Sequence, residues 1–303
     1  MHRLGEGTTG LDSYFGPVRN PWNPKHISGG SSSGSAAAVA SGMCYATLDT
    51  DAIGSCRLPA ACCGVVGFKG TYGLISPKGI LDGEQPPDET ILWLSHPGII
   101  TRSVEDTAIV LDVLEERKQH RPTAHTLRQH SKQRKLRIGV ANNFKADREV
   151  SAAFEKADEN IRGMGHTVNS VAAPLVGLER GVSNIEGDQK SIASQSFKDV
   201  DIYLLPTTTT TVPAVEDAGN PLALSWQNTA FANYYGLPAM SLPCGFDSRG
   251  LPLGFQMVAK PWDERTLLYL AHQYQEVAPW DTKHPALDTA GGLQFESARA
   301  YHF

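Results

Sequence analysis

A run of glycine and serine from Gly29 to Ser35 leads directly into a stretch that is rich in alanine. Glycine and serine allow the backbone to form a tight loop, whereas alanine has the highest intrinsic helix propensity. We therefore predict a helix over Ala36 to Ala46, with the hydroxyl of Ser33 or Ser35 as its N-cap. The serine loop would then lie at a helix N-terminus, where unpaired N–H groups favour developing negative charge.

A second motif, Thr50 to Ala60, contains Ser55, which lies 24 positions after Ser31. Together the two stretches resemble the signature of the amidase-signature family of serine hydrolases. The resemblance implies a Ser–cis-Ser–Lys triad in which Ser55 is the nucleophile and Ser31 is the serine after a cis peptide bond. It covers most of residues 1–115 and 200–275. It implies an α/β fold, in which a mixed β-sheet core is flanked by helices on both faces.

The chemistry of amide hydrolysis explains why these residue types are needed. A serine hydroxyl is a poor nucleophile at neutral pH, so it must lose its proton to a nearby base as it attacks the amide carbonyl. The tetrahedral intermediate then needs preorganised N–H donors. We expect the backbone of Ala52, Ile53 and Gly54, next to Ser55, to supply them. Similar proteins usually have glycine where this chain has Ile53, and a β-branched residue avoids positive φ. If the loop requires a positive φ at this position, isoleucine would distort the oxyanion hole.

Four further residues match positions that brace this loop through hydrogen bonds in the family: Ser32, Thr50, Asp51 and Arg57. For Asp51 and Arg57 taken alone, ordinary turn and surface polarity is an equally good interpretation. Cys56, beside the proposed nucleophile, has no histidine in its motif to lower the pKa of its thiol, so we expect it to pack in the interior.

The lysine of the triad has no counterpart in the sequence. The only lysine before the serine loop is Lys25, whose neighbours match the variable approach to the loop. Lys69 and Lys78 match other positions of the family, and we expect them to be structural. The sequence therefore predicts an N-terminally truncated member with impaired activity, in which the lysine comes from an omitted segment or from a separate chain.

Three functions remain open at this point. The first is hydrolysis of a carboxamide through serine acyl-enzyme chemistry. The second is a catalytically inactive amidase-like remnant that acts as a binding or structural protein. The third is a part similar to the glutaminase subunit of a tRNA-dependent amidotransferase, although residues 220–235 look more like the free amidases. Gly30 to Gly34 also fits the nucleophile elbow of α/β-hydrolases, but no strand precedes it.

Composition limits the remaining possibilities. With 303 residues and 41% apolar residues, the chain can bury a sizeable core. We expect a single domain over residues 1–303, shortened between about 171 and 198. A net charge of -5 favours neither nucleic acid nor an anionic membrane, and no run approaches the ~18 apolar residues of a membrane span. We expect a cytoplasmic protein that binds a small-molecule amide, with a homo-oligomer or a complementing chain possible.

Five cysteines without zinc spacing indicate buried thiols, and the sequence indicates neither a metal nor a cofactor. Apolar periodicity predicts a helix over Val104 to Leu114 behind a Ser103 cap. It also predicts a β-α-β unit that starts at Leu136 and restarts as a strand after Gly165. Other predicted strands lie near residues 63–68 and 201–206, and the polar stretch 117–135 is predicted to be a solvated linker.

Overall fold

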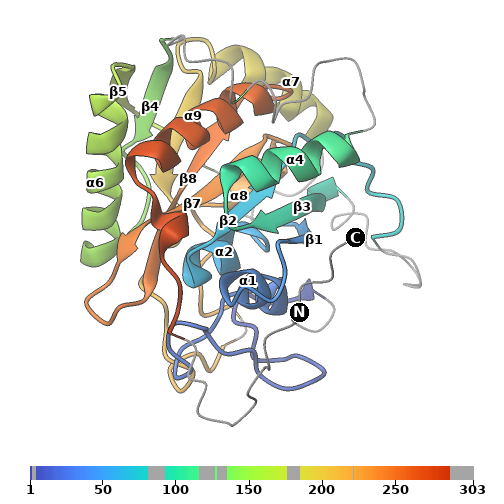
Figure 1. Cartoon of the computed structure of the whole chain (residues 1–303). Coiled ribbons are helices and arrows are strands. Elements are labelled where there is room, and N and C mark those ends of the chain that lie inside the picture. The colour runs from blue at the N-terminus through green and yellow to red at the C-terminus, as the bar shows by residue number, and fades with distance from the viewer. Residues whose placement is uncertain are drawn as a thin grey trace, which may run out of the picture.

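The computed structural model describes residues 1, 5–80, 93–115, 127, 135–175, 185–220 and 222–286. Within these residues the chain forms one eight-stranded sheet with the order β1-β3-β2-β7-β8-β6-β4-β5 (Figure 1). The strands are β1 Ala46–Asp51, β2 Val66–Lys69, β3 His96–Thr101, β4 Arg137–Ala141, β5 Thr167–Val171, β6 Ile202–Pro206, β7 Ala239–Phe246 and β8 Pro252–Ala259. Strand β4 is parallel to β5 and to β6, and the other neighbouring strands are antiparallel, so the sheet is mixed.

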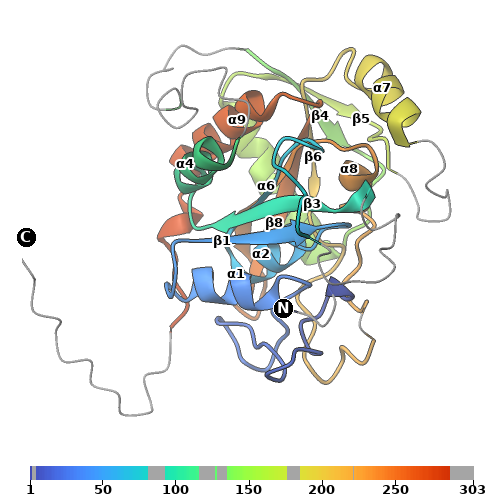
Figure 2. The same cartoon turned by 90° about the vertical axis from the view of Figure 1, so that its right-hand side faces the viewer.

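Helices cover both faces of this sheet (Figures 1 and 2). They are α1 Ser33–Ala40, α2 Arg57–Cys63, α4 Val104–Leu114, α6 Arg148–Gly163, α7 Ile185–Gln195, α8 Ala230–Tyr234 and α9 Glu264–Val277. Along β8, Phe255 and Met257 join one apolar core with α4, α6 and α9, whereas Val258 joins a second core with α7 and α8. This alternation is the two-residue period of a strand that is buried on both faces. The predicted α/β fold with a mixed, helix-flanked sheet is confirmed.

Local sequence signals predicted several elements well. Helix α4 begins behind Ser103, whose hydroxyl accepts a hydrogen bond from the N–H of Asp106. The predicted β-α-β unit is β4, α6 and β5, and its two strands are parallel. Helix α6 buries one face, formed by Val150, Phe154, Ala157 and Ile161. The chain turns back toward β5 at Gly165, whose φ of 83° is left-handed and therefore favours glycine.

The predicted helix over residues 36–46 is wrong in its bounds. Helix α1 begins at Ser33, and the N-cap position is Ser32, whose side chain makes no capping hydrogen bond. The helix ends early because Gly42, with a φ of 73°, donates its N–H to Val39 while the N–H of Met43 reaches back to Ala38. This pair of bonds is a Schellman motif, which stops a helix. Ala46 accordingly begins β1 instead of ending a helix.

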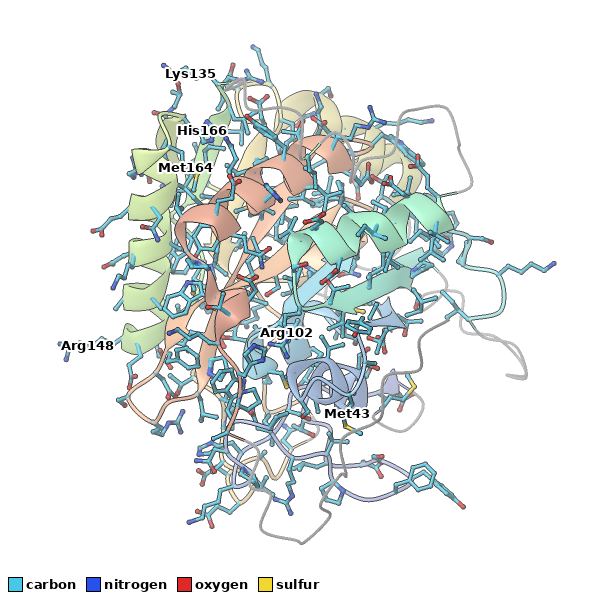
Figure 3. All side chains as sticks on the ribbon, viewed as in Figure 1. Met43, Arg102, Lys135, Arg148, Met164 and His166 are labelled. Atoms are coloured by element: carbon cyan, nitrogen blue, oxygen red, sulfur yellow. The ribbon has the colours of Figure 1, made fainter. Side chains whose placement is uncertain are left out.

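Strand β3 and helix α1 are joined by Arg102, which lies beside the end of α1 (Figure 3). Its guanidinium donates to the carbonyl oxygens of Val39 and Ala40, each at 2.8 Å. A cation at a helix C-terminus satisfies carbonyl groups that have no partner inside the helix. Arg102 therefore fixes α1, and with it the serine loop that precedes α1.

Parts of the predicted organisation fall outside the described residues. The predicted linker over 117–135 does so except for residues 127 and 135, and residues 176–184 of the predicted shortened region do so as well. In the part of the chain that the structure describes, no helix combines the length and the apolar character needed to cross a membrane.

Candidate active site

The two predicted serines lie on loops that are bonded to each other. Ser31 is 1% exposed and Ser55 is 6% exposed. The backbone N–H of Ser32 donates to the carbonyl oxygen of Ser55 at 3.2 Å, so the loop before α1 lies against the loop before α2. The peptide bond between Gly30 and Ser31 is cis, as the resemblance implies.

Glycine is required where the serine loop packs closely against other backbone segments. A Cβ atom added at Gly29 would lie 2.7 Å from the Cα of Pro59 in α2, and one at Gly30 would lie 2.8 Å from the carbonyl oxygen of Gly7. Real Cβ atoms essentially never come this close to backbone. The glycines of the motif therefore let the loop pack between α2 and the segment around Gly7, which brings Ser31 into the interior.

The loop that carries Ser55 is wrapped around the carboxylate of Asp51, the last residue of β1. This carboxylate accepts hydrogen bonds from the N–H of Gly54 at 2.8 Å, Cys56 at 3.2 Å and Arg57 at 3.4 Å. A φ of 132° at Gly54 lets the chain make this turn. Residues 51–57 thus form a closed turn with Ser55 on it.

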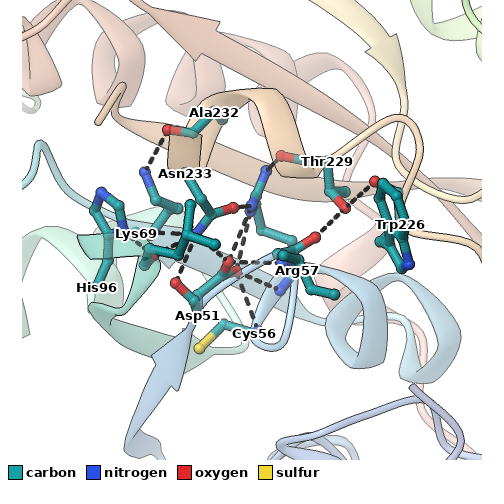
Figure 4. Close-up of polar contacts among 12 residues, drawn as sticks. Asp51, Cys56, Arg57, Lys69, His96, Trp226, Thr229, Ala232 and Asn233 are labelled. Atoms are coloured by element: carbon teal, nitrogen blue, oxygen red, sulfur yellow. Dashed lines mark hydrogen bonds and ion pairs between the residues drawn. The ribbon is translucent and has the colours of Figure 1, made fainter. Parts of the chain in front are cut away.

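Asp51 is also paired with Arg57, and both side chains are fully buried (Figure 4). The guanidinium donates from Nε and from Nη2 to the carboxylate, each at 3.0 Å. Burial alone raises the pKa of Asp51, but the charge and hydrogen bonds of Arg57 outweigh it and hold that pKa well below its usual range. The interpretation of these two residues as surface polarity is therefore wrong.

The other hydrogen bonds of Arg57 reach residues far along the chain, at α8 and in β8. Arg57 Nη1 donates to the carbonyl oxygen of Thr229 at 3.0 Å and to Oε1 of Gln256 at 2.8 Å, and Nη2 donates to Oδ1 of Asn233 at 2.5 Å. Sequence reasoning missed Thr229, Asn233 and Gln256. The usable signal was a polar residue, Asn233, inside the otherwise apolar and aromatic helix α8.

The predicted oxyanion donors divide into two groups. The N–H of Gly54 is committed to Asp51. The N–H groups of Ala52, Ile53 and Ser55 have no hydrogen-bond partner among the described residues. The predicted distortion at Ile53 does not occur, because its φ is not positive and the left-handed position falls on Gly54. The carbonyl oxygen of Ile53 accepts a hydrogen bond from Oγ1 of Thr229 at 2.5 Å.

The remaining predicted bracing residues surround Cys56. Its Sγ lies 3.3 Å from the carbonyl oxygen of Thr50 and 4.0 Å from Oγ of Ser32. Burial, followed by the nearby carboxylates of Asp49 and Asp51, raises the pKa of the Cys56 thiol well above its usual value. A buried thiol that stays protonated packs in the interior and does not act as a nucleophile.

No lysine ammonium is hydrogen-bonded to Ser31 or Ser55 within the described ranges. Lys25 is exposed. Lys69 is fully buried, and its ammonium donates to the carbonyl oxygens of Gly70, Ala232 and Leu237. Burial and the charge of Arg57 lower the pKa of Lys69. Because Ala232 lies in α8 and Leu237 lies shortly after it, Lys69 anchors α8.

Comparison with known proteins assigns the chain to a family. A family model described as "Amidase" matches residues 1–185 and 188–268. The chain is 29% identical to a glutamyl-tRNA(Gln) amidotransferase subunit of Thermosynechococcus vestitus, over 95% of this chain and 75% of that protein. It is 32% identical to a fatty acid amide hydrolase of Arabidopsis thaliana, over 95% of this chain and 58% of that protein.

Solved structures give the same result. The structure of a 6-aminohexanoate cyclic dimer hydrolase in complex with its substrate has a TM-score of 0.79 and 28% sequence identity. It covers 94% of this chain, and the chain covers 75% of it. A glutamyl-tRNA(Gln) amidotransferase subunit from Thermotoga maritima has a TM-score of 0.72 and 26% identity. The chain belongs to the amidase family, whose hydrolases act on carbon–nitrogen bonds of amides.

Proposed function

We propose that this chain hydrolyses a small carboxamide through an acyl-enzyme on Ser55, with Ser31 as the proton relay. The observation that carries the proposal is the hydrogen bond from the N–H of Ser32 to the carbonyl oxygen of Ser55, because it joins the two serine loops. Ser55 Oγ attacks the amide carbonyl while its proton passes to Ser31 and on to a base. The amine then leaves with a proton, and water hydrolyses the ester on Ser55.

The negative charge of the tetrahedral intermediate needs donors that are already in place. In this proposal the N–H groups of Ala52, Ile53 and Ser55 provide them, since the N–H of Gly54 is held by Asp51. One such donor is worth about 3 kcal/mol of transition-state stabilisation in known cases. The buried ion pair of Asp51 and Arg57 supports these donors by fixing the turn from which they project.

The base of the proposed reaction is a lysine carried by another stretch of polypeptide or by a complementing chain. The contacts of Lys69 support this assignment, because its ammonium is occupied by the carbonyl groups of Gly70, Ala232 and Leu237. A complementing chain agrees with the relatives that are named as a subunit of an amidotransferase.

A single domain with a shortened interior is the organisation that we propose. Strands from residue 46 to residue 259 share one sheet, which supports one domain. The alignment with the Thermosynechococcus relative extends over 370 residues, more than the 303 residues of this chain, so that relative has segments without a counterpart here. The match to the family model breaks between residues 185 and 188, inside the region predicted to be shortened.

The proposed function is tested by labelling the protein in its native host, together with any complementing chain, with a fluorophosphonate, a probe that reacts with activated serines. We expect one label per chain, on the peptide that contains Ser55, and no label on Ser55→Ala. Loss of the relay in Ser31→Ala should slow labelling by about 10²- to 10⁴-fold. Ser35→Ala, a variant of a serine on the same segment whose hydroxyl bonds Asp49, should label at the wild-type rate.

Substrate assays accompany this test. The assayed substrates are a fatty acid amide, a cyclic dimer of 6-aminohexanoate and an aryl acylamide. They are chosen because one relative and two structural neighbours are named for acting on them. Glutamine belongs in the same panel, because several relatives at 29% to 30% identity are amidotransferase subunits. A native protein that, together with any complementing chain, neither labels nor hydrolyses any of them would refute the proposal and favour the inactive remnant.

A further inference from the structure

Asn233 contacts both members of the buried ion pair that shapes the nucleophile loop. It lies on α8, its side chain is fully buried, and it is separated from Asp51 by 182 positions of sequence. We propose that Asn233 is a positioning residue for Ser55, acting through Asp51. This inference rests on the proposed function, since it assigns Asn233 a role in the reactivity of the proposed nucleophile.

The amide of Asn233 uses both its donor and its acceptor at this point. Its Nδ2 donates to the backbone carbonyl oxygen of Asp51 at 2.6 Å and to the side-chain Oδ1 of Asp51 at 2.9 Å. Its Oδ1 accepts from Nη2 of Arg57 at 2.5 Å. A primary amide is an uncharged group that can donate to a carboxylate and accept from a guanidinium at the same time. Asn233 therefore fixes the orientation of Asp51 and Arg57 relative to each other (Figure 4).

The same carboxylate oxygen connects Asn233 to the nucleophile loop. Oδ1 of Asp51 accepts from Asn233 and from Arg57, and it also accepts from the N–H of Gly54 at 2.8 Å. A rotation of this carboxylate would move Gly54, and the next residue along the backbone is Ser55. Because Asn233 restrains this carboxylate from α8, its loss should displace the Ser55 hydroxyl and the neighbouring N–H donors.

Helix α8 is itself held in place, which a positioning residue requires. The Lys69 ammonium donates to the carbonyl oxygens of Ala232 and Leu237, on either side of Asn233 along the chain. At the N-cap of the helix, Thr229 bonds the carbonyl oxygen of Ile53 in the loop. The segment 229–237 is therefore anchored at both ends and contacts the nucleophile loop.

The test compares Asn233→Leu with the matched control Asn228→Leu. Leucine is similar in size to asparagine but its side chain neither donates nor accepts a hydrogen bond. Asn228 is also a buried asparagine of this region, 1% exposed, and its side chain exchanges hydrogen bonds with the backbone of Lys145 at 2.8 Å and 3.2 Å. It makes no hydrogen bond to Asp51 or Arg57 in the described structure. Both variants lose buried hydrogen bonds, so they control for a general loss of stability.

Two measurements are made on the full-length variants at a temperature at which circular dichroism shows them to be folded. The first is the rate of fluorophosphonate labelling of Ser55, separated into the limiting rate and the half-saturating probe concentration. In Asn233→Leu we expect the limiting rate to fall by about 10- to 100-fold, because a displacement of about 1 Å has effects of this size. The half-saturating concentration should change less than about threefold, since probe binding does not involve Asn233. Asn228→Leu should leave both quantities near the wild-type values.

The second measurement is hydrogen exchange of the backbone amides in residues 52–57. We expect Asn233→Leu to accelerate exchange at Gly54 and Cys56, whose N–H groups bond Asp51, and Asn228→Leu to leave it unchanged. Wild-type labelling rates in Asn233→Leu, or equal effects of the two variants, would overturn the proposal. If the wild-type protein takes no label even together with any complementing chain, the proposed function fails, and the exchange measurement alone decides. Unchanged exchange in Asn233→Leu then overturns the role of Asn233 as well.

Discussion

At the scale of single residues, the candidate site depends on one buried charge pair. Arg57 and Asp51 are both fully buried, and the guanidinium donates to a carboxylate, a backbone carbonyl group and two side-chain amide oxygens. Removing two charges from water is costly, and only a complete set of partners offsets the cost. The neighbours on α8 and β8 are therefore as necessary to the pair as the two charged residues are.

We predict that Arg57→Met destabilises the protein by about 3–5 kcal/mol, because it leaves the Asp51 carboxylate buried without its counter-ion. The double variant Asp51→Leu/Arg57→Met should lose less than the sum of the two single variants, since it removes both charges together. Urea unfolding followed by tryptophan fluorescence measures the free energy of unfolding. Additive effects in this cycle would contradict the coupling of the two residues.

At the scale of elements, the end of α1 determines where β1 can begin. Gly42 adopts a left-handed conformation after the last helical turn, and Arg102 holds the carbonyl groups of that turn. Without this stop the alanine-rich sequence would favour a longer helix, and β1 could not start at Ala46. The strand that ends at Asp51 therefore depends on a glycine that precedes it in the chain.

We predict that Gly42→Ala destabilises the protein by about 1 kcal/mol, because alanine resists a φ of 73° even though no atom lies within 4 Å of the added Cβ. The matched control is Gly163→Ala at the end of α6, where φ is not left-handed and the added Cβ also meets no atom within 4 Å. It should stabilise the protein by up to about 1 kcal/mol through helix propensity. Thermal unfolding measures the change in stability of each variant. Changes of the same sign in both variants would contradict the left-handed role assigned to Gly42.

At the scale of the whole molecule, the fold joins segments that lie far apart in the sequence. Strand β2 is followed by Thr71, whose N–H donates to Oε1 of Glu264 at 2.8 Å, and its hydroxyl is bonded to the same carboxylate. The hydroxyl oxygen also accepts from the N–H of Trp262 at 2.8 Å. These contacts span 191 to 193 positions of sequence and fix the start of α9 against the exit from β2.

We predict that Glu264→Leu lowers the free energy of unfolding by about 1–3 kcal/mol, since it leaves the buried N–H of Thr71 without an acceptor. Glu276→Ala, an exposed glutamate on the same helix, should change it by less than about 0.5 kcal/mol. Chemical unfolding distinguishes the two variants. A Glu264→Leu variant as stable as the Glu276→Ala control would show that this long-range contact contributes little.

The sequence by itself determined the features that depend on residues close together in the chain. The helix behind Ser103, the parallel β-α-β unit from residue 137 to residue 171 and the two serine loops follow from spacing, capping and glycine within short windows. The family followed from the same windows. Gly42 also marked the end of α1 in the sequence, but a prediction from helix propensity alone extended the helix to Ala46.

Only the tertiary structure decided which groups surround the proposed nucleophile. Arg57 contacts Thr229, Asn233 and Gln256, which lie 172 to 199 positions away. Whether Asp51 is a surface turn or a buried carboxylate depends on these partners, and no local pattern contains them. The physical reason is that a buried charge is tolerated only when distant segments bring donors and acceptors to it, and the sheet, not the motif, brings those segments together.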